Sequence, residues 1–67
     1  MLTEKQVQRL YEDQLNRVIG YYHVAVSDAS KKDVYEAHVW TLCRIGKILE
    51  INEEDTFARI RAAVKKA

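Results

Sequence analysis

The side chains with the most reactive chemistry in this chain are two imidazoles and one thiol. His23, His38 and Cys43 are potential metal ligands, and a thiol beside an imidazole can act as a nucleophile. Their spacing favours neither role, because a chelating pair on one helix needs ligands three or four residues apart and Cys43 follows His38 by five. We therefore expect no metal site and no catalytic residue, with His23 solvated, His38 hydrogen-bonded near the core and Cys43 a small buried thiol.

The carboxylates are numerous, but their positions indicate solvated faces and helix starts. Glu12 and Asp13 fall on a polar face, and an acidic run over residues 53–55 matches the first turn of a helix. The chain has two glycines and no glycine-rich phosphate loop, and 67 residues leave little room for a substrate pocket. We expect neither enzyme activity nor a cofactor.

Three helix-start signals divide a chain that has no proline. In each one, a small oxygen-bearing residue stands three places before a longer polar acceptor, over residues 3–6, 33–36 and 52–55. Thr3 and Asp33 head the first two signals, with Gln6 and Glu36 able to reach back to the cap. Ser30 also qualifies as the second cap, so the start of the second helix is open by two or three residues.

Hydrophobic periodicity predicts an all-α fold in a single helical domain over residues 1–67. The first helix carries an apolar stripe with intervals of three and four residues, which fits a helix and excludes a strand. We expect a long antiparallel helical hairpin, about 4–28 and 34–50, plus a short C-terminal helix, about 53–66. Short connections make neighbouring helices antiparallel or steeply crossed. The expected core residues are Tyr11, Val18, Tyr22, Leu42 and Ile45.

The first helix has more apolar surface than one neighbour can cover. Leu10, Tyr21 and Val24 widen its apolar arc to about 200°, against about 100° for an ordinary surface helix. The third helix is too short to cover the whole hairpin. Trp40 leaves the stripe of the second helix and is either an interface anchor or covered by another helix of the same chain. We expect contact with a partner through Leu10, Tyr21, Val24 and Trp40.

Two glycines lie inside helices and have different expected roles. Gly46 flanks the stripe of the second helix, where a small residue lets the first helix come close. Gly20 lies mid-helix on the polar face, where it costs about 1 kcal/mol relative to alanine. It marks either a kink or a close approach by a partner.

These features predict a small cytosolic protein–protein interaction module that acts through apolar helix faces. Its expected partner is a second copy of the chain, giving a homodimer, or another helical protein, and no membrane is expected as a partner. The single cysteine suits a reducing compartment, and a formal net charge of +1 gives no field to draw in a polyanion. The alternative is a small nucleic-acid-binding regulator that uses the basic end of the last helix, namely Arg59, Arg61, Lys65 and Lys66. The acidic start of that helix disfavours it, because a recognition helix meets bases and phosphates there.

Overall fold

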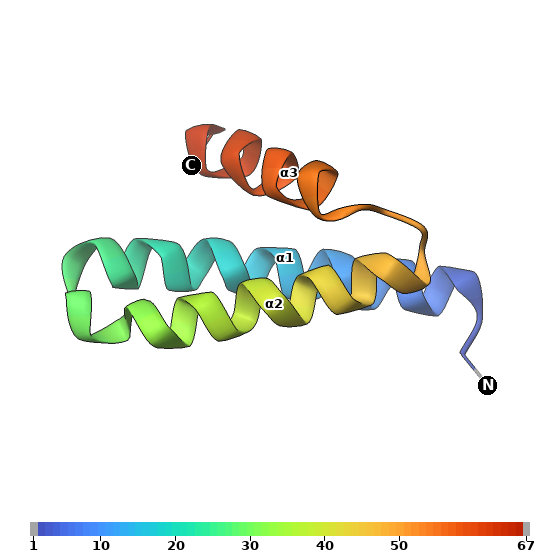
Figure 1. The fold of residues 1–67 in the computed structure, drawn as a ribbon, viewed down its shortest axis with the longest axis horizontal. Coiled ribbons are helices and arrows are strands. Elements are labelled where there is room, and N and C mark those ends of the chain that lie inside the picture. The colour runs from blue at the N-terminus through green and yellow to red at the C-terminus, as the bar shows by residue number, and fades with distance from the viewer. Residues whose placement is uncertain (1, 67) are drawn as a thin grey trace.

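The computed structural model describes residues 2–66 and folds them into three α-helices (Figure 1). Helix α1 spans Glu4–Ser27, α2 spans Lys32–Ile48 and α3 spans Glu53–Lys66, with a turn of 3₁₀ helix, η1 (Ala29–Lys31), between α1 and α2. The predicted all-α fold, a long helix pair followed by a short helix, is confirmed. Within the described part of the chain, no helix has the length and apolar character needed to span a bilayer.

Helix α1 starts at the capping box that the sequence predicts. The Gln6 backbone N–H donates to the Thr3 hydroxyl at 3.2 Å, and the Thr3 N–H donates to the Gln6 side-chain oxygen at 2.8 Å. The two bonds satisfy N–H groups that a bare helix start would leave unpaired. The helix then continues through Gly20 to Ser27 without interruption.

The turn between α1 and α2 is built on Asp28, and neither of the predicted caps, Ser30 or Asp33, caps the second helix. The Asp28 carboxylate accepts from the Ser30 hydroxyl at 2.7 Å and from the Ser30 backbone N–H at 3.1 Å. Helix α2 begins at Lys32 with no side-chain cap, so Asp33 lies within its first turn. The cap signal fails at Asp33 because Asp28 caps η1 first, and α2 continues from η1.

Helix α2 ends two residues before the predicted position. Glu50 adopts φ 60°, the left-handed conformation that terminates many helices. The Glu50 N–H donates to the Lys47 carbonyl at 3.1 Å and the Ile51 N–H to the Gly46 carbonyl at 2.8 Å, which is the Schellman pattern. Asn52 then caps α3 as predicted, since its side-chain oxygen accepts from the Asp55 N–H at 2.8 Å.

The core lies where α3 crosses the hairpin. Tyr11, Val18 and Leu42 are buried as predicted, whereas Tyr22 and Ile45 are half-buried at the edge. The buried apolar cluster consists of Tyr11, Val18, Val39, Leu42, Cys43 and Ile60.

Gly46 and a buried threonine allow all three helices to meet closely. A Cβ atom added to Gly46 would lie 3.2 Å from the Tyr11 ring and 3.3 Å from the Thr56 hydroxyl. The Thr56 side chain is fully buried, and its hydroxyl is hydrogen-bonded to the Tyr11 hydroxyl at 3.0 Å. The close approach predicted at Gly46 is therefore confirmed, and the polar pair ties α1 to α3.

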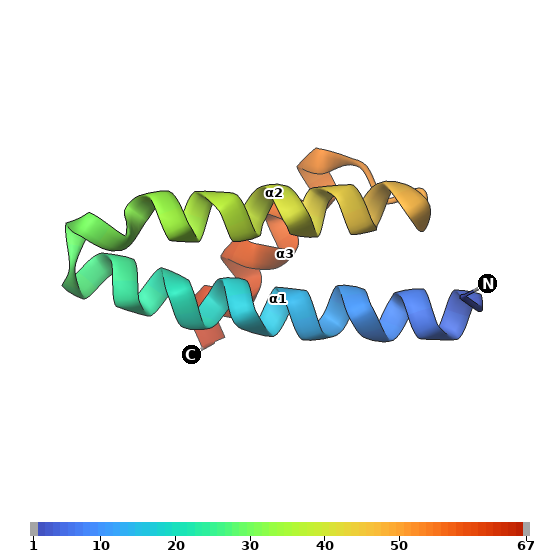
Figure 2. The ribbon, with the colours of Figure 1, turned by 90° about the horizontal axis from the view of Figure 1, so that it is seen from below.

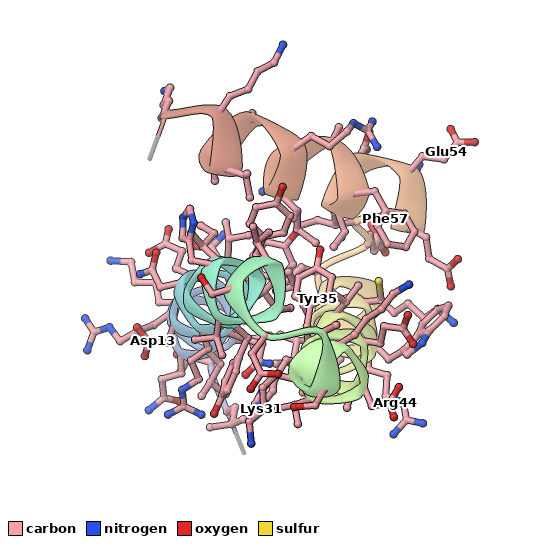
Figure 3. All side chains as sticks on the ribbon, turned by 90° about the vertical axis from the view of Figure 1, so that its left-hand side faces the viewer. Asp13, Lys31, Tyr35, Arg44, Glu54 and Phe57 are labelled. Atoms are coloured by element: carbon pink, nitrogen blue, oxygen red, sulfur yellow. The ribbon has the colours of Figure 1, made fainter. Side chains whose placement is uncertain are left out.

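Helix α3 lies across one face of the hairpin only. Figure 2 looks onto the other face, where α1 and α2 run side by side in front of α3. The end-on view in Figure 3 places α3 above the hairpin, with Phe57 on the side of α3 that faces it. One broad face of the hairpin therefore has no helical neighbour among the described residues.

Candidate interaction surfaces

We call the side of the hairpin opposite α3 the open face. On α1, Tyr11 and Tyr22 mark the side toward α3, since Tyr11 bonds Thr56 and Tyr22 shares a hollow with α3. At about 100° per residue, the residues predicted to contact a partner on α1 lie roughly 100–160° around the helix from Tyr22. They are Leu10, Tyr21 and Val24. On α2, Val39 and Gly46 mark the side toward α3. Helical geometry then places Val34, Ile45 and Ile48 on the opposite side of the hairpin. The apolar residues of the open face are thus Leu10, Tyr21, Val24, Val34, Ile45 and Ile48, and the same geometry places the exposed Arg17 on this side of α1.

The apolar residues of the open face are substantially exposed to solvent. The exposed fraction is 46% for Leu10, 45% for Val24, 38% for Val34 and 69% for Ile48. Exposed apolar residues are ordinary when scattered, but a contiguous patch marks an interaction surface. Here two adjacent helices contribute to one side of the molecule.

A small polar cluster occupies the middle of the open face. The Gln14 amide nitrogen donates to the His38 backbone carbonyl at 3.1 Å and to His38 Nδ1 at 3.0 Å. Because a carbonyl only accepts, the amide nitrogen of Gln14 must face it, and the same nitrogen lies within hydrogen-bond distance of Nδ1. The Tyr21 ring stacks on the His38 ring, with centroids 4.3 Å apart. These contacts fix the register of α1 against α2.

The two flanks of the open face carry opposite charges at one level. Tyr22 packs on Tyr35, and Tyr11 lies beside Gly46. The residue numbers add up to 57 in both pairs. Because α1 and α2 are antiparallel, other pairs with this sum lie at the same height along the hairpin. Asp13 on α1 and Arg44 on α2 form such a pair. Figure 3 shows them pointing away from the hairpin on opposite sides. Asp13 therefore lies level with a basic residue across the face, while Arg9 and Arg17 lie one turn before and after it on its own helix.

The space around Gly20 is open. A Cβ atom built on it meets nothing within 4 Å among the described residues, in contrast to the crowded position of Gly46. A kink and a close approach by a partner both stay predictions for this glycine.

The structure does not bring Trp40 together with Leu10, Tyr21 and Val24. Trp40 lies on the α3 side of α2, where it is 53% exposed and borders a hollow of about 320 Å³. We call this the Trp40 hollow, and its lining consists of Tyr35, Glu36, Val39, Trp40 and Phe57. The four predicted contact residues thus belong to two surfaces, three to the open face and one to this hollow.

The basic residues of α3 do not form a single patch. The Arg59 guanidinium lies over the Tyr11 ring, 5.6 Å from its centroid, in a hollow that Glu4 and Glu12 also line. Arg61 and Lys65 line a different hollow, about 120–160° around α3 from Arg59 by helical geometry. Lys66 is exposed at the end of the helix.

The imidazoles and the thiol have the surroundings expected of structural groups. Cys43 is buried, and its burial, reinforced by Glu53 and partly offset by Lys47, raises the pKa of the thiol. His23 is exposed and His38 is held by Gln14. Over residues 2–66, no group of three or more His, Cys, Asp or Glu side chains is arranged to hold a metal ion.

Two buried polar residues were not predicted from the sequence. Gln14 is 6% exposed and Thr56 is 0% exposed, and each ties two helices together by hydrogen bonds. Gln14 falls on the apolar stripe between Tyr11 and Val18, and that position is the signal for its burial. Thr56 carries no comparable signal, because its partner is 45 residues away in the sequence.

The class defined by these observations is a small three-helix domain with one uncovered face. The chain matches no protein-family model, and the searches of curated proteins and of solved structures gave no match either.

Proposed function

We propose that this protein is an interaction module that self-associates through the open face. The observation that carries the proposal is the exposure of Leu10, Val24, Val34 and Ile48 on one side of the hairpin. A chain of this size buries a smaller fraction of its surface alone than a larger domain does, so covering this patch would add stability that the monomer lacks. The lone thiol of Cys43 supports placing the module in a reducing compartment such as the cytosol.

The dimensions of the molecule bound the size of this interface. The molecule measures 38 Å along the hairpin and 17 Å across it in the view of Figure 2. A rectangle of these dimensions covers roughly 650 Å², so a specific interface of about 1,200 Å² in total would use most of this side of each copy.

The charged flanks favour one geometry for the dimer. A two-fold axis parallel to the hairpin places α1 of one copy against α2 of the other. Asp13 then faces the Arg44 of the second copy at both edges, and Leu10 and Val24 come level with the partner's Ile48 and Val34. Opposite charges at the rim of an apolar patch fix the register of two surfaces.

Nucleic-acid binding has less support. The basic residues of α3 lie on two sides of the helix, and Arg59 already contacts Tyr11 and shares its hollow with two carboxylates. A salt titration against duplex DNA tests this alternative, since phosphate contacts make affinity fall steeply with salt.

Sedimentation equilibrium of two matched variants tests the proposal. Val24→Lys puts a charge on the open face, whereas Val26→Lys makes the same change two residues along on another side of α1, at a site that is 69% exposed. We expect the wild type and Val26→Lys to show twice the chain mass at high micromolar concentration. Val24→Lys should show the monomer mass, because burying an unpaired ammonium opposes association. A monomeric wild type, or equal behaviour of the two variants, would contradict the proposal.

A further inference from the structure

The Trp40 hollow is rich in aromatic side chains, and the proposed dimer does not use it. Three of its five lining residues are aromatic, namely Tyr35, Trp40 and Phe57, and Glu36 is the one charged residue among them. Its volume of about 320 Å³ lies at the lower end of the range for small-ligand sites, about 300–1,000 Å³. It lies on the α3 side of the hairpin, away from the proposed dimer interface.

Two helices build the hollow. Glu36 and Trp40 are four residues apart on α2, so their side chains lie one above the other on the same side of that helix. Val39 is buried beneath them, and Phe57 approaches from α3 (Figure 3). Trp40 and Phe57 take part in none of the ring pairs recorded for residues 2–66, which leaves their faces available.

The hollow suits an organic cation. An aromatic face attracts a positive charge through the ring quadrupole, and tryptophan does so most strongly. The cation–π contact found within the described residues joins Arg59 to Tyr11 and does not involve Trp40, although Arg44 follows Trp40 by one turn of α2. Glu36 adds a carboxylate at the same place. Glu36 also raises the pKa of the Tyr35 hydroxyl, after the larger effects of burial and Tyr22, which agrees with the two groups being close.

The chemistry of the lining selects among cations. A lysine ammonium brings three N–H donors, whereas the side chains here offer acceptors only on Glu36 and Tyr35. The backbone carbonyls of α2 are engaged within the helix. A methylated ammonium has few or no N–H groups to satisfy and presents methyl groups to the rings.

From these observations we infer that the Trp40 hollow binds a methylated ammonium group, carried on a side chain of a partner polypeptide. The inference does not depend on self-association, because the hollow and the open face share no residue.

Fluorescence of Trp40, the chain's one tryptophan, provides a direct readout. The probes are choline and 3,3-dimethyl-1-butanol, which have the same shape but differ in charge, each at constant ionic strength. We expect saturable binding of choline with a millimolar dissociation constant, and binding about tenfold weaker for the neutral alcohol. Equal responses to the two probes, or no saturation with choline, would overturn the inference.

Three variants separate recognition from folding. Glu36→Gln should weaken choline binding several-fold, whereas Glu12→Gln, the same change outside the hollow, should leave it unchanged. Phe57→Leu keeps an apolar side chain while removing a ring, and should also weaken binding with the helical circular dichroism preserved. Equal affinity of Glu36→Gln and wild type would contradict the inference. Val24→Lys should bind choline like the wild type, so failure of the dimer proposal and failure of this one are distinguishable.

A peptide pair tests the source of the group. A peptide carrying trimethyl-lysine should shift the Trp40 emission and compete with choline, and the same peptide with unmodified lysine should bind several-fold more weakly. Equal binding of both peptides, or binding of free choline without either peptide, would refute a methylated side chain as the ligand.

Discussion

The two faces of the helical hairpin are built from the same helices and differ in how far their apolar side chains are exposed to solvent. On the face that α3 covers, Tyr11 and Leu42 are 3% and 0% exposed. On the open face, Leu10 and Ile48 are 46% and 69% exposed. Both helices therefore carry apolar surface for two contacts, while the chain supplies a third helix for only one. The open face therefore keeps apolar surface exposed to solvent, and outside it Trp40 and Val26 are also exposed, at 53% and 69%.

The largest effect should come from removing a core side chain on the covered face. Leu42→Ala leaves a cavity in a fully buried site, and we expect it to lower the free energy of unfolding by about 3 kcal/mol. Leu10→Ala, measured at concentrations where the protein is monomeric, should cost less than about 1 kcal/mol. Chemical denaturation followed by circular dichroism gives both values. Similar losses would mean that the two faces are equally buried and would break the comparison.

The two glycines provide a smaller contrast of opposite sign. Gly46→Ala should destabilise the fold by about 1–3 kcal/mol, because its new methyl group would press on Tyr11 and Thr56. Gly20→Ala should stabilise the monomer by about 1 kcal/mol, since alanine is the better helix former and the space is open. Thermal unfolding of dilute samples checks both signs. Loss of stability in Gly20→Ala would show that this site is not free.

The smallest effect concerns the turn that joins the two helices. Hydrogen bonds from the Ser30 hydroxyl and N–H lower the pKa of the Asp28 carboxyl below its ordinary value. A lowered pKa in the folded state contributes stability above the unfolded pKa of about 3.9, and that contribution is lost as the pH falls through the folded pKa. In Asp28→Asn, the free energy of unfolding should therefore fall less steeply as the pH is lowered through the folded pKa of Asp28. Identical curves for wild type and variant would remove Asp28 from the account.

The helices and the open face were predictable from the sequence because both depend on local periodicity. The stripe of α1, its capping box and its excess apolar width can all be read over a few turns. The cap of α2 was predicted wrongly because Asp28, a few residues upstream, competes with Asp33 for the same role. Local signals of equal strength cannot be ranked without the geometry of the turn.

The position of Trp40 was not predictable, because it depends on where α3 crosses the hairpin. Gly46, Tyr11 and Thr56 determine that crossing through contacts between residues far apart in the sequence. A helical wheel shows that Trp40 leaves the stripe of α2, but not that Phe57 will arrive beside it. The Trp40 hollow is therefore a product of tertiary packing.

The central claim, self-association through the open face, is tested most directly by sedimentation equilibrium of two charge-reversed variants, alone and mixed. Asp13→Arg and Arg44→Asp each place like charges together at both edges of the proposed dimer, and each alone should self-associate about tenfold more weakly than wild type. An equimolar mixture pairs the opposite charges again and should regain the wild-type association as a heterodimer. A monomeric wild type, or variants that associate as strongly alone as when mixed, would contradict the account.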